Sequence, residues 1–115
     1  ETRILAHPAA NQSIPAAADQ EDFVSMGLTT TQKTRQIMEN CFGVLAIEMI
    51  AGAQALDIRG GKPGAGVAAA HGVIREHIEH LDEDRPLFPD NDTMVELLKS
   101  GELLAAVEDA IGALD

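Results

Sequence analysis

The feature that most constrains this fold is a proline-free stretch from about Asp22 to Ile58 in which helix-forming residues dominate. An α-helix rises about 1.5 Å per residue, so this stretch would form a helix of more than about 50 Å, longer than a small domain is wide. Residues 41–58 are apolar on nearly every side, with Glu48 and Gln54 as the polar exceptions. A helix that is apolar all round must be surrounded by others. The remaining short helices cannot surround it, so we expect a larger assembly, formed with other subunits or with further polypeptide.

The segments around this helix predict an all-α chain with no credible strand. Residues 1–20 hold Pro8 and Pro15 among small and polar residues, and are expected to be extended and irregular. The glycine-rich residues 60–64 end the long helix. A second, amphipathic helix is expected from about Ala65 to Leu81.

Two shorter helices are expected after a loop that includes Pro89. Thr93 and Glu96 have the spacing of a capping box, which predicts a short helix through Lys99. Ser100 can then cap a last amphipathic helix.

The formal net charge of −11 disfavours two classes of partner. Nucleic acid is not expected, because phosphate binding needs clustered Lys and Arg. An anionic membrane surface is disfavoured for the same reason. The acidic C-terminal part is expected to be a solvated outer face.

The lone cysteine and the chain start bear on localisation and processing. Cys41 cannot form an internal disulfide, which fits a reducing cytoplasm, and it is expected to be a small buried hydrophobe. The apolar run of residues 41–53 is interrupted by Glu48 and is judged too short to cross a bilayer. The chain starts at Glu1 rather than Met, as a processed or excised piece would.

Several polar groups could carry chemistry, but each also has a structural explanation. The acidic cluster of residues 19–22 stands before the long helix, where carboxylates cap amides and offset the helix dipole. Glu48 would be buried, and is expected to form an ion pair or an interhelical hydrogen bond. His77 and His80 could share a metal ion, yet no third ligand has a suitable spacing, so no metal site is predicted.

Three stretches together resemble one known family. Residues 13–15 (Ser-Ile-Pro) followed by residues 19–27 (Asp-Gln-Glu-Asp-Phe-Val-Ser-Met-Gly) closely resemble a signature of the aromatic amino-acid ammonia-lyases, above all of their histidine branch. Residues 45–57 and 81–90 also match, in the same order and at similar spacing. The resemblance covers essentially the whole chain and corresponds to the C-terminal part of such an enzyme.

The resemblance implies a mostly helical homotetramer in which long helices form a common central bundle. Such enzymes remove ammonia from an α-amino acid without oxidation, metal or nicotinamide. Their electrophile, 4-methylidene-imidazol-5-one (MIO), forms from an internal Ala-Ser-Gly. This chain contains no Ala-Ser-Gly and no Tyr, although catalytic tyrosines belong to the family pattern. The 115 residues alone are therefore expected to be inactive without the N-terminal portion of the same enzyme.

One active-site residue carries over from the resemblance. Glu21 matches the glutamate of the histidine enzymes, where phenylalanine and tyrosine lyases have Gln, and is expected to be catalytic and substrate-binding. Gln20 is expected to assist in substrate binding. Phe23 stands where the family often has His, which leaves fine specificity open.

The leading hypothesis is a cytoplasmic histidine ammonia-lyase piece that helps to convert L-histidine to urocanate. The chain would comprise an extended active-site segment (1–20), a long central-bundle helix (21–59) and a C-terminal helical segment (60–115). A phenylalanine or tyrosine lyase or aminomutase is the alternative within the family. A helical interaction module that has lost the chemistry is the alternative outside it.

Overall fold

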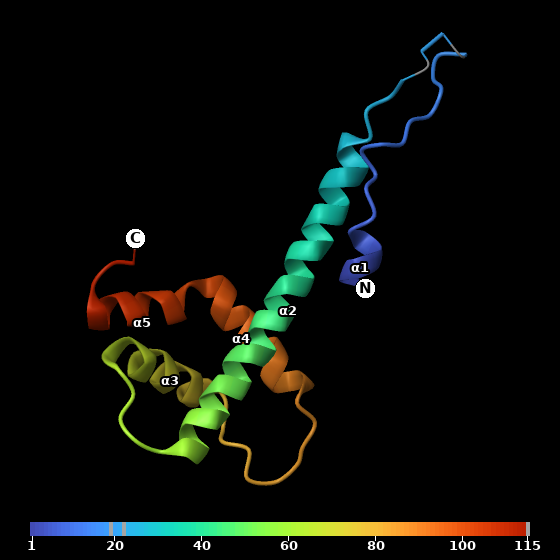
Figure 1. The fold of residues 1–115 in the computed structure, drawn as a ribbon. Coiled ribbons are helices and arrows are strands. Elements are labelled where there is room, and N and C mark those ends of the chain that lie inside the picture. The colour runs from blue at the N-terminus through green and yellow to red at the C-terminus, as the bar shows by residue number, and fades with distance from the viewer. Residues whose placement is uncertain (19, 22, 115) are drawn as a thin grey trace. The chain divides into compact units, whose positions relative to one another are not determined.

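The computed structural model describes residues 1–18, 20–21 and 23–114, and it is all-α over them, as predicted. Figure 1 shows the helices, which are α1 (Thr2–Leu5), α2 (Gly27–Arg59), α3 (Ala65–His77), α4 (Phe88–Ser100) and α5 (Glu102–Ile111). The described residues contain no strand, only an isolated antiparallel bridge between Ala16 and Glu21. The chain divides into two compact units, residues 1–41 and 42–115, and the division falls within α2.

In the first unit, the N-terminal segment runs back along the first half of α2. The Gln36 amide donates to the Glu1 carboxylate at 2.6 Å, and the Lys33 ammonium donates to the main-chain carbonyl of His7. Ala9 is the buried apolar residue among the described residues of this unit. Polar contacts rather than a hydrophobic core therefore hold the segment to the helix.

The start of α2 corrects the sequence prediction. The helix begins at Gly27, with a first bond from the Thr30 N–H to the Met26 carbonyl at 2.9 Å, rather than near residue 21. Residues before Gly27 bond to the preceding segment instead, because Glu21 pairs with Ala16. The short helix α1 also interrupts the segment that was expected to be irregular throughout. Asp19 and Asp22 lie outside the described residues.

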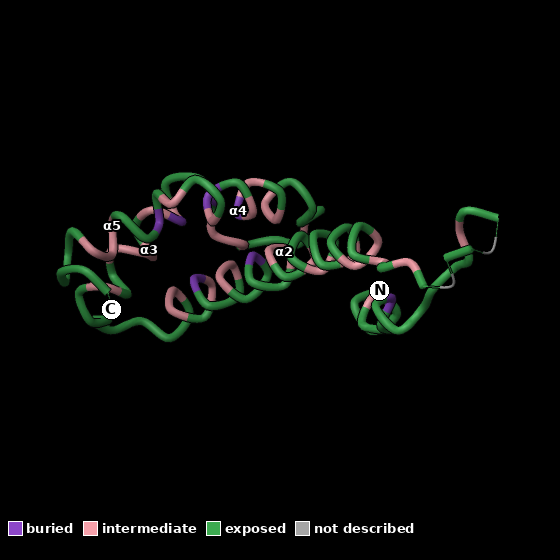
Figure 2. Tube along the Cα trace, turned by 90° about the horizontal axis from the view of Figure 1, so that it is seen from above, coloured by how far each residue is buried: buried purple, intermediate pink, exposed green. Residues whose placement is uncertain are grey.

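The second unit has a small aliphatic core between α2 and the three C-terminal helices. Ala46 and Ala53, seven residues apart on α2, present one narrow stripe to it. Figure 2 shows buried positions on α2 and α4 as purple segments. Bulkier side chains complete the core, namely Ile74, Ile78, Met94, Leu97 and Leu103. Gly66 allows α3 to pack closely on α5: a Cβ there would lie 3.1 Å from the Ile111 Cδ1 atom, a tight contact.

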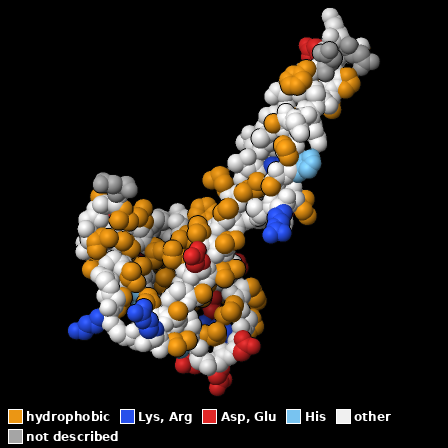
Figure 3. Space-filling model, in the orientation of Figure 1, with side chains coloured by type: hydrophobic (Ala, Val, Ile, Leu, Met, Phe, Trp, Pro, Cys, Tyr) orange, Lys and Arg blue, Asp and Glu red, His pale blue; other side chains and the backbone are white. Residues whose placement is uncertain are grey.

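Most of the apolar surface of α2 stays uncovered, as expected for a helix that needs more neighbours. Val44, Ile47 and Ile58 are 64%, 61% and 75% exposed. Figure 3 shows hydrophobic side chains gathered along this helix. Glu48 and Cys41 are also exposed in this single chain, because its own helices cover only the side of α2 that includes Ala46 and Ala53. The predicted burial of Glu48 at a subunit contact stays a prediction.

The length argument against a membrane span also needs correction. α2 continues well beyond residues 41–53, and an 18-residue window of it reaches a mean hydropathy of 1.6. By length and composition α2 could cross a bilayer. The core helix of a soluble helical assembly has the same two properties.

The end of α3 differs from the prediction for a specific polar reason. The helix ends at His77, and Ile78 is extended, with φ −129° and ψ 116°. The Arg75 guanidinium donates to the Ile78 carbonyl at 3.1 Å, which satisfies a group released by the helix end. The residues that were expected to continue the helix thus form an extended arm beginning at Ile78.

The beginning of α4 contradicts the predicted capping box. The helix starts at Phe88, and Pro89 lies in the first turn, where its missing N–H costs nothing. Thr93 is inside the helix, and its hydroxyl donates to the Pro89 carbonyl at 2.9 Å. Gly101, with φ 80°, joins α4 to α5, and the Ser100 hydroxyl accepts the Glu102 N–H at 3.2 Å.

Substitution of Gly101 tests whether the junction between α4 and α5 needs a residue with positive φ. Gly101→Ala should lower the free energy of unfolding by about 1–2 kcal/mol, because alanine is strained at positive φ. Gly72→Ala is the control: Gly72 lies inside α3 with open space around its Cβ position. This change should raise stability by about 1 kcal/mol. Urea denaturation followed by circular dichroism measures both, and the same sign for the two variants would contradict the need for positive φ at this junction.

Candidate functional site

Gln20 and Glu21, the two site residues that the family resemblance predicts, lie on a tight reversal of the chain that precedes α2. The Ala16 N–H donates to the Glu21 carbonyl at 2.9 Å, and the Glu21 N–H donates to the Ala16 carbonyl at 3.1 Å. This reciprocal pair fixes the backbone of Glu21. The side chains of Gln20 and Glu21 are exposed, so in this chain both can approach a ligand from solvent.

The reversal contains two alanines in the left-handed region, Ala17 with φ 50° and Ala18 with φ 54°. Such a conformation costs a non-glycine residue on the order of 1–3 kcal/mol, and persists where the surroundings impose it. The Gln20 N–H closes the turn on the Ala17 carbonyl at 3.1 Å. Strain of this kind is common at ligand sites, which makes the reversal a candidate site on physical grounds as well.

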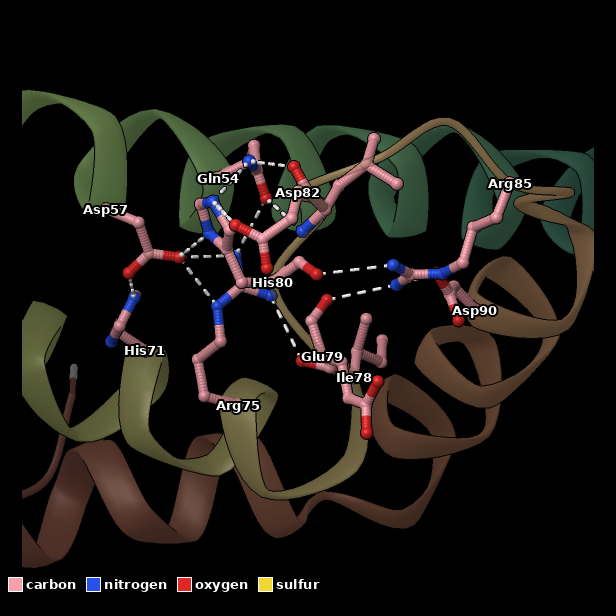
Figure 4. A network of polar contacts seen from close by, with 11 residues as sticks. Gln54, Asp57, His71, Arg75, Ile78, Glu79, His80, Asp82, Arg85 and Asp90 are labelled. Atoms are coloured by element: carbon pink, nitrogen blue, oxygen red, sulfur yellow. Dashed lines mark hydrogen bonds and ion pairs between the residues drawn. The ribbon is translucent and has the colours of Figure 1, made fainter.

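A second polar cluster lies in the other unit and centres on Asp57 of α2 (Figure 4). Its Oδ1 contacts the His71 Nε2 at 2.6 Å, and its Oδ2 accepts the Arg75 Nε–H at 2.8 Å. The His80 Nδ1 lies 3.1 Å from the same Oδ2. One carboxylate thereby ties α2 to α3 and to the extended arm.

Gln54 holds the arm by pairing with the backbone of Leu81. The Gln54 carboxamide accepts the Leu81 N–H at 3.0 Å and donates to the Leu81 carbonyl at 3.1 Å. This pairing fixes which end of the amide is NH₂, and the same nitrogen lies 3.2 Å from the His80 Nε2. The Nε2 must therefore accept, and the proton of a neutral His80 lies on Nδ1, facing Asp57.

Arg85 extends the cluster to α4. Its guanidinium donates to the carbonyls of Glu79 and His80, at 3.0 Å and 3.2 Å, and to the Asp90 carboxylate at 2.8 Å. The loop between α3 and α4 is therefore held by side chains at both of its ends.

The electrostatics of the cluster favour an ionised Asp57. The His80 hydrogen bond is the largest effect on the Asp57 carboxyl, and desolvation, the next largest, opposes it. With the Arg75 and His71 contacts added, the pKa of the carboxyl is held well below its ordinary value. A carboxylate this well neutralised is a poor general base. The Asp57 cluster is therefore suited to holding structure rather than to moving protons.

The histidines singled out in the sequence separate in the structure. His80 joins the Asp57 cluster, whereas His77 lies 3.3 Å from the Glu102 carboxylate. No group of three or more metal-binding side chains occurs among the described residues.

The Asp57 cluster itself was not predicted as a unit. Gln54 and Asp57 are three residues apart and share a face of α2, and His71 and Arg75 are four apart and share a face of α3. These spacings are the feature of the sequence from which the Asp57 cluster could have been predicted. Which face meets which helix depends on tertiary packing.

The model of the aromatic amino acid lyase family matches residues 1–76. A histidine ammonia-lyase of Sorangium cellulosum (strain So ce56) is 49% identical over the whole chain, and one of Gloeobacter violaceus is also 49% identical over the whole chain. The chain belongs to the aromatic amino acid lyase family.

Solved structures agree with this family assignment. Histidine ammonia-lyase from Trypanosoma cruzi superposes with a TM-score of 0.87 and 30% identity over 95% of this chain. Tyrosine aminomutase from Streptomyces globisporus gives 0.86 and 33% over 93%. This lyase-family chain spans about 23% of the length of its first curated relatives and about 21–22% of these two structures.

The Asp57 cluster predicts how the stability of this lyase-family chain depends on pH. Because the folded-state pKa is lowered, the stabilisation is present above the unfolded value, about 3.9, and is lost as pH falls toward the folded value. At pH 7, Asp57→Asn should have a lower urea midpoint than the parent chain. Below about pH 4 the gap between the two midpoints should narrow, because the parent chain loses the stabilisation by the Asp57 charge.

Asp84→Asn is the control for this experiment, because Asp84 is an exposed loop carboxylate. It should leave the midpoint unchanged across the pH range. A deficit of Asp57→Asn that persists undiminished at pH 2–3 would show that packing, not charge, explains the loss.

The hydrogen-bond pattern also predicts a tautomer. Long-range ¹H–¹⁵N spectra at neutral pH should show His80 protonated on Nδ1, because Gln54 donates to its Nε2. Gln54→Leu removes that donor, so neutral His80 should then populate both the Nδ1-protonated and the Nε2-protonated tautomers. An Nε2-protonated His80 in the unsubstituted chain would contradict the assignment.

Proposed function

We propose that this chain is the C-terminal part of a histidine ammonia-lyase, which eliminates ammonia from L-histidine to give urocanate. The observation that carries the proposal is the 49% identity over the whole chain to two proteins named histidine ammonia-lyase. Glu21, the residue that resembles the histidine-branch glutamate, supports the same choice.

Glu21 is proposed as the catalytic and substrate-binding carboxylate of this part. A carboxylate can form a charge-assisted hydrogen bond with a substrate ammonium or imidazole, and can take a proton from a correctly placed carbon. The backbone hydrogen bonds of Glu21 with Ala16 fix the position of its Cα, and the exposed side chain is accessible to a substrate. Gln20, next to it on the reversal, is proposed to help bind the substrate.

The electrophilic MIO group must come from elsewhere in the full-length protein. Its Ala-Ser-Gly precursor does not occur in these 115 residues, and neither does any Tyr. The residues of this chain therefore do not fit the group as its source. We propose that the chain alone is inactive, and that it contributes Glu21 to a site completed by the N-terminal portion of the enzyme.

We further propose that the exposed apolar surface of α2 is covered by protein in a cytoplasmic homotetramer. Glu48 and Gln54 lie within the apolar half of the helix. A carboxylate at the centre of a bilayer costs about 2.5–3.5 kcal/mol on insertion scales, whereas a protein interface can offer a partner. The uncovered aliphatic surface suits either environment, so these two polar side chains carry the choice of protein over lipid.

A tyrosine lyase or aminomutase is the second candidate, favoured by the likeness to tyrosine aminomutase at a TM-score of 0.86. Assaying the full-length protein on histidine, phenylalanine and tyrosine separates the two. Urocanate from histidine supports the first proposal, and an isomerised or deaminated aromatic amino acid supports the second. A gene that starts at or just before Glu1 would instead support a helical module without chemistry.

The role of Glu21 has a direct kinetic test in the full-length protein. Glu21→Gln keeps the size of the side chain but removes its charge and basicity, so kcat for histidine should fall by about 10²–10⁴-fold. The control Glu83→Gln changes an exposed loop carboxylate of the other unit and should retain kcat. Sedimentation should show the same oligomer for both variants. Undiminished turnover in Glu21→Gln would refute the role.

A further inference from the structure

The segment that carries Glu21 is held at both ends by contacts with the preceding segment. At one end, Glu21 and Ala16 exchange both of their backbone hydrogen bonds. At the other end, the Val24 N–H donates to the Ser13 hydroxyl at 2.8 Å. Ser13 lies three residues before Ala16 and Val24 three after Glu21, so both contacts obey one antiparallel register.

The hydroxyl of Ser13 supplies a contact that the backbone does not make at this position. Only the Ala16–Glu21 pair forms a backbone bridge among the described residues of this segment. An isolated bridge fixes one point of a segment and leaves its direction free to swing. A second contact in the same register fixes the direction as well.

The strained turn next to Glu21 increases the need for this second contact. Ala17 and Ala18 are both left-handed, a conformation that the chain leaves readily unless neighbouring contacts impose it. The Ser13–Val24 bond opposes that relaxation from the far end of the segment. Ser13 is thereby connected to Glu21 through the backbone, without touching its side chain.

We propose that Ser13 is a positioning residue for the proposed Glu21 carboxylate: its hydroxyl, by accepting the Val24 N–H, holds Val24 in the register that the Ala16–Glu21 pair sets and so aims Glu21 at the substrate. The inference rests on the proposed lyase function. It adds a residue that acts through the backbone and makes no contact with the reacting atoms. Catalytic rate is sensitive to displacements of about 1 Å in such groups, so a small swing of the segment should be visible in kcat.

The first experiment tests the contact itself, independently of any activity. In the full-length protein, amide exchange at Val24 should accelerate several-fold, up to about tenfold, in Ser13→Ala, because one hydrogen bond is lost. Ser13→Thr keeps a hydroxyl and should retain slow exchange. Equal exchange in the parent chain and Ser13→Ala would overturn the proposal.

The second experiment tests the consequence for catalysis in the full-length protein. Ser13→Ala should lower kcat for histidine by about 10–100-fold, with thermal stability unchanged, and Ser13→Thr should restore most of it. Ser100→Ala is the matched control, because it also removes a hydroxyl that accepts a backbone N–H, at Glu102 in the other unit. It should leave kcat unchanged.

The outcomes separate this inference from the proposed function. If Glu21→Gln abolishes turnover while Ser13→Ala does not lower it, Glu21 keeps its role and the positioning role of Ser13 is wrong. If Glu21→Gln retains full turnover, the proposed role of Glu21 is wrong and the positioning role fails with it. If Ser13→Ala does not fold, Ser13→Cys, whose thiol is a weak acceptor, replaces it, and full kcat in that variant overturns the proposal.

Discussion

The C-terminal half of α2 is apolar on nearly every side, but the other helices of the chain cover only a narrow stripe of its surface. Ala46 and Ala53 meet the C-terminal helices, whereas Val44, Ile47 and Ile58 remain largely exposed. Burying each such side chain contributes roughly 1.5–3 kcal/mol. A helix with this much uncovered surface is most stable within a larger body, which agrees with a chain spanning about 23% of its relatives' length.

The Asp57 cluster explains why the C-terminal unit needs little hydrophobic core. The unit encloses few large buried side chains, so the extended arm after α3 depends on polar contacts. Asp57 and Gln54 are on the same face of α2 and hold, respectively, two residues of α3 and the backbone of Leu81. Both oxygens of the Asp57 carboxylate and both ends of the Gln54 amide have hydrogen-bonding partners, which favours stabilisation by a partly buried polar cluster.

The chain reversal that carries Glu21 differs from the helical unit in having no hydrophobic core among its described residues. It has little apolar packing, two strained alanines and exposed side chains, and it is held by a few backbone and hydroxyl contacts. A segment of this kind can place a carboxylate for chemistry because neighbouring chain imposes its shape. The described residues thus fall into a helical unit held by a small core and a polar cluster, and a strained, exposed reversal that carries Glu21.

The helical class, the long helix and, through the matched signature, the family could be read from the residues alone. The site role of Glu21 and the need of the long helix for neighbouring protein were predicted in the same way, and both stay predictions. These follow from periodicity, composition and motif order, which are local properties. Tertiary packing set the end of α3 at His77, the burial of Ile78 and the exposure of Glu48 in this chain. It also brought three polar side chains, His71, Arg75 and His80, to Asp57. It also decided that α2 begins only at Gly27, because Glu21 pairs backward with Ala16. The physical reason is common to all of these: a helix end and a polar partner depend on which groups from distant parts of the chain satisfy the free backbone and side-chain hydrogen bonds.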